Sequence, residues 1–327
     1  MRYTKSLGML AAVASLFAAA GPYAAEWKPE KPVELVVPAA PGGGTDFIAR
    51  TVQKIATSQR LIGLPMQVVN KPGGAGSLAF TYIAQHRGNP HFVSVTYPSL
   101  LTNHIVGTSP LRHSEFTSLA LLRNAYMGFA VRADSPLKTP KDLLDRVRKD
   151  PQSVVFSTFA LGGPNHLALV LVMKAAGVDV RKLKVVVFAS GGESQTALLG
   201  GHVDVVPTGL YNLRGPVQDG RLRVLAITAP KRSEGVFAQV PTWKENGIDA
   251  VMGQWFGIIG PQGMTAAHIA FWDEGLARVV QTDEWKAELQ RNAEDNEYLN
   301  SRDSRRFLDQ QYDEYRRILA ELGLAKQ

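Results

Sequence analysis

The sequence predicts an α/β protein made of two Rossmann-like lobes that are joined by crossover strands. Short β-branched runs alternate with stretches of helical periodicity along most of the chain. Glycine-rich loops connect several of these runs to the helices that follow them. The length of 327 residues also suits two domains, since about 150 residues per domain is usual.

The amino-terminal half contains two strand–loop–helix units and a third strand. Apolar spacing, β-branched runs and turn residues place their boundaries. The expected elements are a strand at 33–37, a helix at 46–61, a strand at 66–69, a helix at 78–86 and a strand at 92–96. Glycine-rich loops at 41–45 and 73–77 precede the two helices. Each loop therefore follows the carboxyl end of a strand.

The second half repeats this alternation. A helix is expected to begin at Pro140 with Thr139 as its N-cap. The other expected elements are strands at 127–131, 154–157, 184–188, 203–207, 224–228 and 255–259, helices at 165–176 and 193–199, and a mostly helical tail over 265–323. The crossover strands divide the chain into lobe one, residues 26–130 plus 257–327, and lobe two, residues 131–256.

The first 25 residues are expected to be a secretory signal peptide. Arg2 and Lys5 precede an apolar run over 7–20 that is too short to span a bilayer, and small residues follow it. No later segment has 18 consecutive apolar residues. The mature chain is therefore expected to be an exported, soluble protein, and we expect a monomer.

Composition excludes several classes of protein and of site. Hydrophobic residues make up 45% and charged residues 20%, which is ordinary for a globular chain and excludes disorder and coiled coil. The chain has no cysteine, so it has no disulfide, thiolate nucleophile or Cys-based metal site. A net charge of +7 does not indicate a nucleic-acid partner.

Residues 47–114 contain no Asp or Glu but include six Lys or Arg side chains. Two interpretations stay open: a positive potential that favours an anionic ligand, or a segment of buried strands and small-residue turns. A strand that ends in glycines and leads into a helix also presents free N–H groups and a positive helix end, which bind carboxylate or phosphate.

Dinucleotide binding and common hydrolytic motifs receive little support. Residues 74–79 fit G-x-G-x-x-A, but the acid expected about 20 residues later is missing. The sequence has no H-E-x-x-H and no G-x-S-x-G. His166 can bind a ligand or pack against its loop, and Asp46 can contact a ligand or stabilise a helix dipole. We expect no enzyme, cofactor or metal; a secreted hydrolase without a motif and a ligand sensor remain alternatives.

Ordered motifs over nearly the whole mature chain give it a family resemblance. Residues 38–50, P-A-A-P-G-G-G-T-D-F-I-A-R, resemble the P-x-x-P-G-G-x-x-D-x-x-A-R signature of the tripartite tricarboxylate transporter receptors, also called the Bug family. Further matching segments lie at 69–76, 197–204, 223–226, 240–242, 255–257 and 261–263.

The resemblance implies a two-lobed, type II-like periplasmic binding protein that captures a small carboxylate in an interlobe cleft. Loop amides and bridging waters would hold the carboxylate, and integral-membrane transporter subunits would be the partners. The implied sites are 41–46 with 73–77 in lobe one and 157–166 with 189–195 in lobe two. Candidate ligand-binding residues are Pro41, Gly42, Gly43, Gly44, Thr45, Asp46, Gly73, Gly74, Ala75, Gly76, Ser77, Ser157, Thr158, Gly163, His166, Ser190, Gly191, Glu193 and Asp204.

Two segments depart from the family pattern. Glu193-Ser194 stands where the family usually has Pro-Ala, and Phe159-Ala160-Leu161 replaces a stretch richer in Gly and Ser. Glu193 either complements a helix dipole or faces the cleft, where it would disfavour a second ligand carboxylate. This added acid and bulk argue against a plain tricarboxylate as the ligand.

Overall fold

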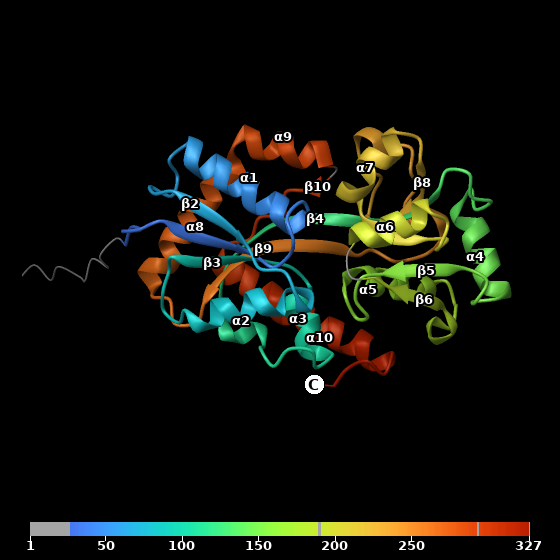
Figure 1. Cartoon of the computed structure of the whole chain (residues 1–327), viewed down its shortest axis with the longest axis horizontal. Helices are drawn as coiled ribbons and strands as arrows, with labels where there is room; N and C mark the ends of the chain where they lie inside the picture. The colour runs from blue at the N-terminus through green and yellow to red at the C-terminus, as the bar shows by residue number, and fades with distance from the viewer. Residues whose placement is uncertain (1–26, 189–190, 293, 327) are drawn as a thin grey trace, which may run out of the picture.

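The computed structural model describes residues 27–188, 191–292 and 294–326. The expected signal peptide over 1–25 lies outside the described residues. Figure 1 shows two groups of helices and strands side by side, connected by the long strands β4 (Phe116–Arg132) and β9 (Gly253–Pro261). The first part of β4 pairs with β9, and its last part pairs with strands of the second group. β4 therefore belongs to both groups.

The first group is built on a mixed sheet with the strand order β10-β4-β9-β3-β1-β2. Its remaining strands are β1 (Val33–Val37), β2 (Met66–Asn70), β3 (Phe92–Thr96) and β10 (Glu294–Asp295). β1 pairs in parallel with both β2 and β3, and β3 pairs antiparallel with β9. The apolar side chains of β1 are buried, as expected for a parallel strand covered on both faces.

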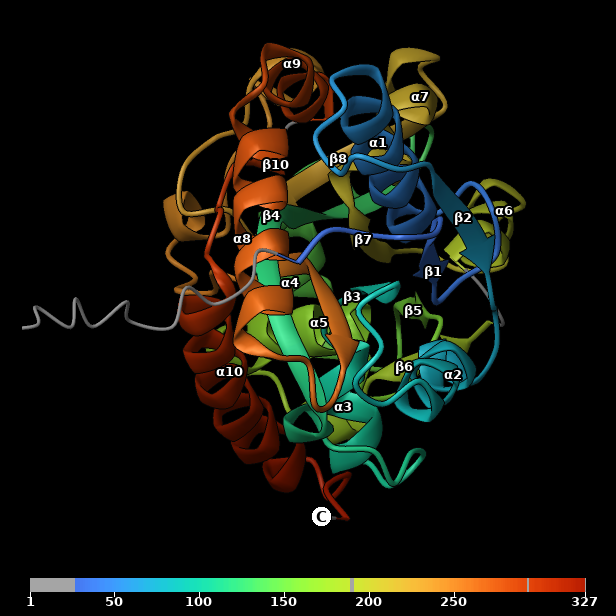
Figure 2. The ribbon, with the colours of Figure 1, turned by 90° about the vertical axis from the view of Figure 1, so that its left-hand side faces the viewer.

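Helices cover both faces of this sheet. Figure 2 shows α1 above the strands and α2 and α3 below them. The helices of this group are α1 (Gly44–Ser58), α2 (Ser77–Gln85), α3 (Ser99–Ile105), α8 (Ala266–Gln281), α9 (Asp283–Asn292) and α10 (Ser301–Glu321). Five short 3-10 helices are distributed over both groups in the described chain. They span Gly74–Gly76 (η1), His113–Glu115 (η2), Val180–Lys182 (η3), Gly235–Phe237 (η4) and Lys244–Asn246 (η5).

The second group has a similar layered arrangement around its own apolar core. Its strands are β5 (Val155–Thr158), β6 (Lys184–Val187), β7 (Val206–Gly209) and β8 (Leu222–Ile227). Its helices are α4 (Pro140–Lys149), α5 (Pro164–Ala175), α6 (Gly191–Leu199) and α7 (Leu210–Gln218). Phe129, Phe156 and Trp243 are fully buried in this core. β5 pairs in parallel with β6 and forms a parallel bridge from Phe156 to Val205, just before β7.

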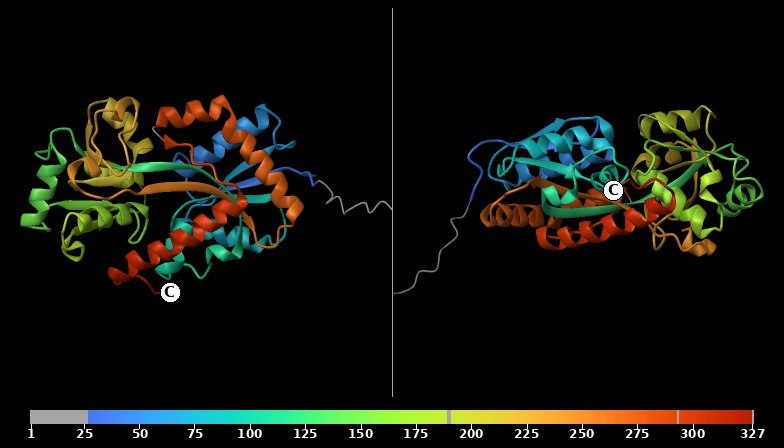
Figure 3. Two further views of the ribbon diagram at one scale, coloured as in Figure 1. Left: turned by 180° about the vertical axis from the view of Figure 1, so that it is seen from behind. Right: turned by 90° about the horizontal axis from the view of Figure 1, so that it is seen from below.

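The helix α10 lies along the join between the two groups, as both views in Figure 3 show. Its Leu308 and Tyr312 pack in one cluster with Leu101 of α3 and Leu167 of α5. The proposed division into lobe one, 26–130 plus 257–327, and lobe two, 131–256, assigns α10 to lobe one. In that scheme α10 is a lobe-one helix that also contacts lobe two.

Most predicted elements are present, with a few differences in their bounds and number. The strand expected at 127–131 is the end of β4, which begins at Phe116. The strand expected at 203–207 begins three residues later, at Val206. Helices α3 and α7 were not expected, because α3 is short and α7 contains the helix breakers Gly215 and Pro216. None of the described helices is long and apolar enough to cross a membrane.

Candidate functional site

The carboxyl ends of the parallel strands form two edges that face each other. β1, β2 and β3 lead into α1, η1–α2 and α3, whereas β5, β6 and β7 lead into α5, α6 and α7. In Figure 1, these helices begin where the two groups meet. A Cβ placed on Gly44 would lie 2.7 Å from Cζ of Tyr211, and one on Gly162 would lie 2.8 Å from Cγ1 of Val106. Ligands of open α/β sheets bind at such strand ends.

The loop over 41–46 offers backbone donors at the start of α1. Gly43 is the N-cap residue, and no side chain caps the helix. Within the described chain, the N–H groups of Gly43, Gly44 and Thr45 donate no hydrogen bond. The N–H of Gly42 is engaged, because it donates to Oδ2 of Asp46 at 3.0 Å. The free donors of this loop therefore begin one residue later than the glycine run itself.

Asp46 fastens this loop to its neighbours. Its side chain is buried, and it accepts hydrogen bonds from Nε of Arg50 at 2.9 Å and from Nδ2 of Asn70 at 2.9 Å, besides the one from Gly42. Burial opposes ionisation, yet these three donors hold the pKa of Asp46 below its ordinary value. Both carboxylate oxygens have protein partners, so the geometry supports a positioning role more than direct ligand contact.

The loop over 73–77 is held in an unusual backbone conformation. Gly73, Gly74, Ala75 and Gly76 all have positive φ, and Ala75 is one of two described non-glycine residues with this property. The hydroxyl of Tyr97 and Nδ2 of Asn103 donate to the carbonyl oxygen of Ala75 at 2.9 and 3.0 Å. Asn103 also donates to Oγ of Ser77 at 3.0 Å. The carbonyl of Ala75 is thus occupied, while the N–H groups of Gly74 and Ala75 have no acceptor among the described residues.

Tyr97 and Asn103 were missed by the sequence analysis. Burial is the main cause that raises the pKa of Tyr97 to about 12, against a smaller lowering by a hydrogen bond with Ser99, so its hydroxyl is a neutral donor at physiological pH. Asn103 is a buried amide in the short helix α3, which also contains Ser99, Thr102 and His104, so no sequence signal set it apart.

Four predicted ligand-binding residues lie in or beside the loop between β5 and α5: Ser157, Thr158, Gly163 and His166. Ser157 is fully buried, and its Oγ has no hydrogen-bond partner in the described chain. Oγ1 of Thr158 donates to the carbonyl of Ala160 at 3.2 Å. Gly163 is the N-cap of α5, and its N–H donates to the same carbonyl at 3.1 Å.

His166 lies in the first turn of α5 and is turned back onto its own loop. Its Nδ1 accepts a hydrogen bond from the N–H of Gly162 at 3.1 Å. Burial lowers the pKa of His166 to about 4, so the ring is neutral at physiological pH. Of its two expected roles, packing against the loop has the direct structural support.

We expect His166 to make the folded chain less stable in acid. Its pKa in the folded chain lies below its ordinary value of 6.5, so the unfolded chain binds the proton first. Above pH 6.5 the ring is neutral in both the folded and the unfolded chain, and the folded chain keeps its full stability. Roughly 3 kcal/mol of the unfolding free energy is lost as the pH falls to about 4. Denaturant titrations of wild type and His166→Asn from pH 7.5 to 4 should diverge by that amount. Parallel curves would contradict this expectation.

The remaining predicted residues of the second group are dispersed. Ser190 lies outside the described residues. Gly191 begins α6, and Glu193 is exposed in its first turn, next to the buried Ser194. Asp204 lies at the opposite end of β5, where its Oδ2 accepts from the N–H of Val155 at 2.8 Å. The structure therefore does not bring Asp204 together with the other candidates.

Tyr211 and Arg123 are two further residues at this edge that sequence reasoning missed. The ring of Tyr211 lies between Gly44 and Gly209, since a Cβ on either glycine would come within 3 Å of it. Arg123 is fully buried in β4, forms an ion pair with Glu294, and donates from Nη2 to the carbonyl of Gly44 at 3.3 Å. Burial lowers the pKa of Arg123 to about 9. The sequence feature that could have identified Arg123 is a charged residue inside the mostly apolar run over 116–132.

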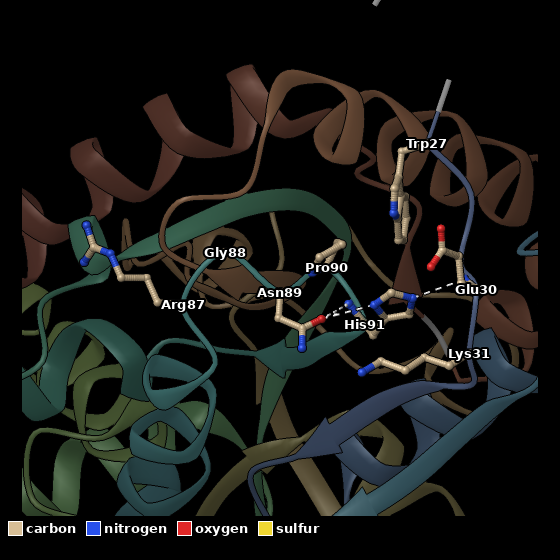
Figure 4. A pocket seen from close by; sticks show the side chains of 8 residues that line it. All are labelled: Trp27, Glu30, Lys31, Arg87, Gly88, Asn89, Pro90 and His91. Atoms are coloured by element: carbon tan, nitrogen blue, oxygen red, sulfur yellow. Dashed lines mark hydrogen bonds between the residues drawn. The ribbon is translucent and has the colours of Figure 1, made fainter. Parts of the chain in front are cut away.

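Two surface cavities lie away from these loops. One, of about 590 Å³, is lined by Trp27, Glu30 and residues 87–91 next to the amino ends of β1 and β3 (Figure 4). There His91 accepts from the N–H of Glu30 at 3.2 Å, and Trp27 packs edge-on against its ring. The other cavity, of about 710 Å³, lies between residues 231–234 and α9–β10. The first is at the wrong sheet edge for an α/β ligand site.

No group of three or more His, Asp or Glu side chains in the described chain could hold a metal ion. The donors at the two edges are instead backbone N–H groups, hydroxyls and amides. Such groups can bind an anion without a cofactor, because they supply hydrogen bonds to oxygen atoms and lie at the positive ends of helices.

The chain is similar to known proteins over most of its length. A family model described as the tripartite tricarboxylate transporter family receptor matches residues 48–324. A Cupriavidus necator protein, described as a UPF0065 protein in the gbd 5′ region, is 27% identical over 326 residues and covers 98% of this chain and 96% of its own.

Solved structures of similar fold include the periplasmic binding protein BugD. It has a TM-score of 0.81 and 22% identity, covering 91% of this chain and 100% of its own. A Rhodopseudomonas palustris protein with adipate has a TM-score of 0.83 and 22% identity, covering 91% of this chain and 99% of its own. These likenesses confirm the predicted fold class, the α/β fold of periplasmic binding proteins.

Proposed function

The chain belongs to the tripartite tricarboxylate transporter receptor family, and from this premise we propose that it captures a small carboxylate between its two lobes and delivers it to integral-membrane transporter subunits. The family is one of receptors. The expected signal peptide supports a periplasmic location for the proposed receptor. The R. palustris neighbour with adipate is a precedent for a carboxylate in this fold.

The observation that carries the proposal is the set of unengaged backbone donors at the facing edges. Gly43, Gly44 and Thr45 at the start of α1, and Gly74 and Ala75 before α2, donate to no described residue. Helix starts concentrate positive potential, and the one acid in the first loop is already occupied by three donors. A ligand carboxylate would complete these hydrogen bonds.

The candidate residues of lobe two are proposed to meet the ligand from the opposite side. The end of β5 and the starts of α5 and α6 bring Thr158, Gly163 and Gly191 to that edge, together with the buried hydroxyls of Ser157 and Ser194. We propose closure of the lobes about β4 and β9, the two long strands that connect them. Asp204 is left out of the contact set, because its carboxylate pairs strands at the far end of β5.

The test measures carboxylate affinity in wild type, Gly43→Pro and Gly43→Ala by isothermal titration calorimetry. Ligands chosen by a thermal-shift screen of mono-, di- and tricarboxylates supply the probes. Gly43 has φ −87°, near the value of about −65° that proline imposes, so the main loss in Gly43→Pro is the N–H donor.

Gly43→Pro is expected to bind about tenfold to hundredfold more weakly, as for the loss of one hydrogen bond to a charged group. Gly43→Ala keeps the N–H, and its added Cβ would have a nearest neighbour at 3.9 Å, so its affinity should stay near wild type. Equal affinities in both variants, with unchanged circular dichroism, would overturn the backbone-amide site.

A further inference from the structure

We propose that the ligand is a monocarboxylate with an apolar aliphatic or aromatic body, which lies against Leu78 and Leu161 while its carboxylate meets the backbone donors. This inference rests on the proposed function and names the substrate class of the same cleft. Three sets of observations carry it: the exposed apolar side chains at the two edges, their placement beside the free donors, and the charges of the surrounding loops.

Exposed apolar side chains are concentrated at the two edges. Leu78 and Leu161 are the most exposed large hydrophobic residues of the described chain, at 61% and 51%. Leu78 lies in the first turn of α2, and Leu161 lies in the loop between β5 and α5. Val187, 49% exposed, ends β6 at the same edge as Leu161. Apolar side chains left in water beside polar donors mark a place where apolar ligand surface can be buried.

The leucines are adjacent to the polar part of the proposed site. A Cβ on Gly73 would lie 2.6 Å from Cδ1 of Leu78, so this side chain folds back over the glycine turn that presents the N–H groups of Gly74 and Ala75. Gly162, which follows Leu161, packs against Val106 at the end of α3. Leu161 therefore lies in a loop that reaches the other group.

The charges of these loops favour one carboxylate over several. The segments 41–46, 72–77, 97–103, 158–166, 191–195 and 207–212 contain no Lys or Arg, and their acids are Asp46 and Glu193. Three cations beside these segments have other partners: Arg50 pairs with Asp46, Lys71 lies 3.9 Å over the ring of Tyr82, and Arg123 pairs with Glu294. A second ligand carboxylate would lose water without gaining a cation.

The test compares matched acids by isothermal titration calorimetry on the mature chain, freed of bound ligand by unfolding, dialysis and refolding. Butanoate, hexanoate and octanoate form the monocarboxylate series, and adipate is the dicarboxylate matched to hexanoate. The dissociation constant should fall about fourfold for each methylene added, since the apolar body is buried. Hexanoate should bind more tightly than adipate, because adipate replaces its methyl end with a second charge.

The side chains are tested by Leu78→Ser and Leu161→Ser. Each should weaken octanoate binding about tenfold and change butanoate binding less than twofold, because butanoate is too short to use the apolar surface. Val251→Ser is the matched control: Val251 is 43% exposed but lies in the segment before β9, outside the loops of the proposed site. It should leave all affinities unchanged.

Two results overturn this inference while leaving the proposed function standing. One is adipate binding more tightly than hexanoate with no gain along the monocarboxylate series. The other is Leu78→Ser and Leu161→Ser behaving like Val251→Ser. If no mono-, di- or tricarboxylate of the thermal-shift screen binds, the proposed function fails as well.

Discussion

Replacing Gly44 by alanine is expected to weaken carboxylate binding about tenfold to hundredfold, the range that corresponds to an overpacking cost of roughly 1–3 kcal/mol. The added Cβ would lie 2.7 Å from Cζ, 2.8 Å from the hydroxyl and 2.9 Å from Cε2 of Tyr211. That ring also faces Phe256 and Gly209, so it has little room to move away. The start of α1 or of α7 must shift, and both edges lose their alignment for the ligand.

Gly43→Ala is the control for this experiment, since it introduces the same methyl group one residue earlier without a close contact. Tyr211→Ala in the Gly44→Ala background should recover affinity relative to Gly44→Ala alone, because it removes the atoms that the new Cβ meets. A double-mutant cycle by calorimetry measures this coupling. Strictly additive losses would show that contact between Gly44 and Tyr211 does not set the cleft geometry.

Replacing Arg123 by methionine is expected to lower the unfolding free energy by about 3–5 kcal/mol, because it leaves the carboxylate of Glu294 buried without its counter-charge. Both side chains are almost fully shielded from water, at 1% and 0% exposure. The rings of Phe47, Tyr211 and Phe256 surround the guanidinium and supply no second anion. Urea denaturation followed by circular dichroism measures the loss.

The double variant Arg123→Met with Glu294→Met should recover most of that stability, since apolar residues of similar volume can replace a buried ion pair at little cost. Lys141→Met tests an exposed pair, Lys141 with Asp145 on α4, and should change stability by less than about 1 kcal/mol. A loss in Arg123→Met no greater than in Lys141→Met would contradict the predicted role of the buried pair.

Much of the fold was predictable from local sequence patterns. The strands at 33–37 and 92–96 are found within the expected bounds, and α4 begins at Pro140 with Thr139 as its N-cap. These features follow from β-branched runs, glycine and proline stops, and a capping residue, all of which act over a few neighbouring residues. The ordered motifs also identified the family, because they extend along nearly the whole mature chain.

The composition of the candidate site was predictable only in part. The glycine loops at the carboxyl ends of β1 and β2 were located correctly, since a strand, a glycine run and a helix are consecutive in the chain. Their role as ligand donors stays a prediction. The engagement of the Gly42 N–H by Asp46 could not be read from the sequence, because it also depends on Arg50 and Asn70 holding that carboxylate in place.

By itself, the sequence determined the order of strands and helices, the glycine loops at the strand ends and the family, because each is encoded by residues close together in the chain. The tertiary structure decided which groups at those loops are occupied and which are free. Tyr97 and Asn103 reach Ala75, Tyr211 reaches Gly44, and Glu294 reaches Arg123, all across long sequence separations. Such contacts depend on how the sheets and helices pack, and no local pattern specifies them.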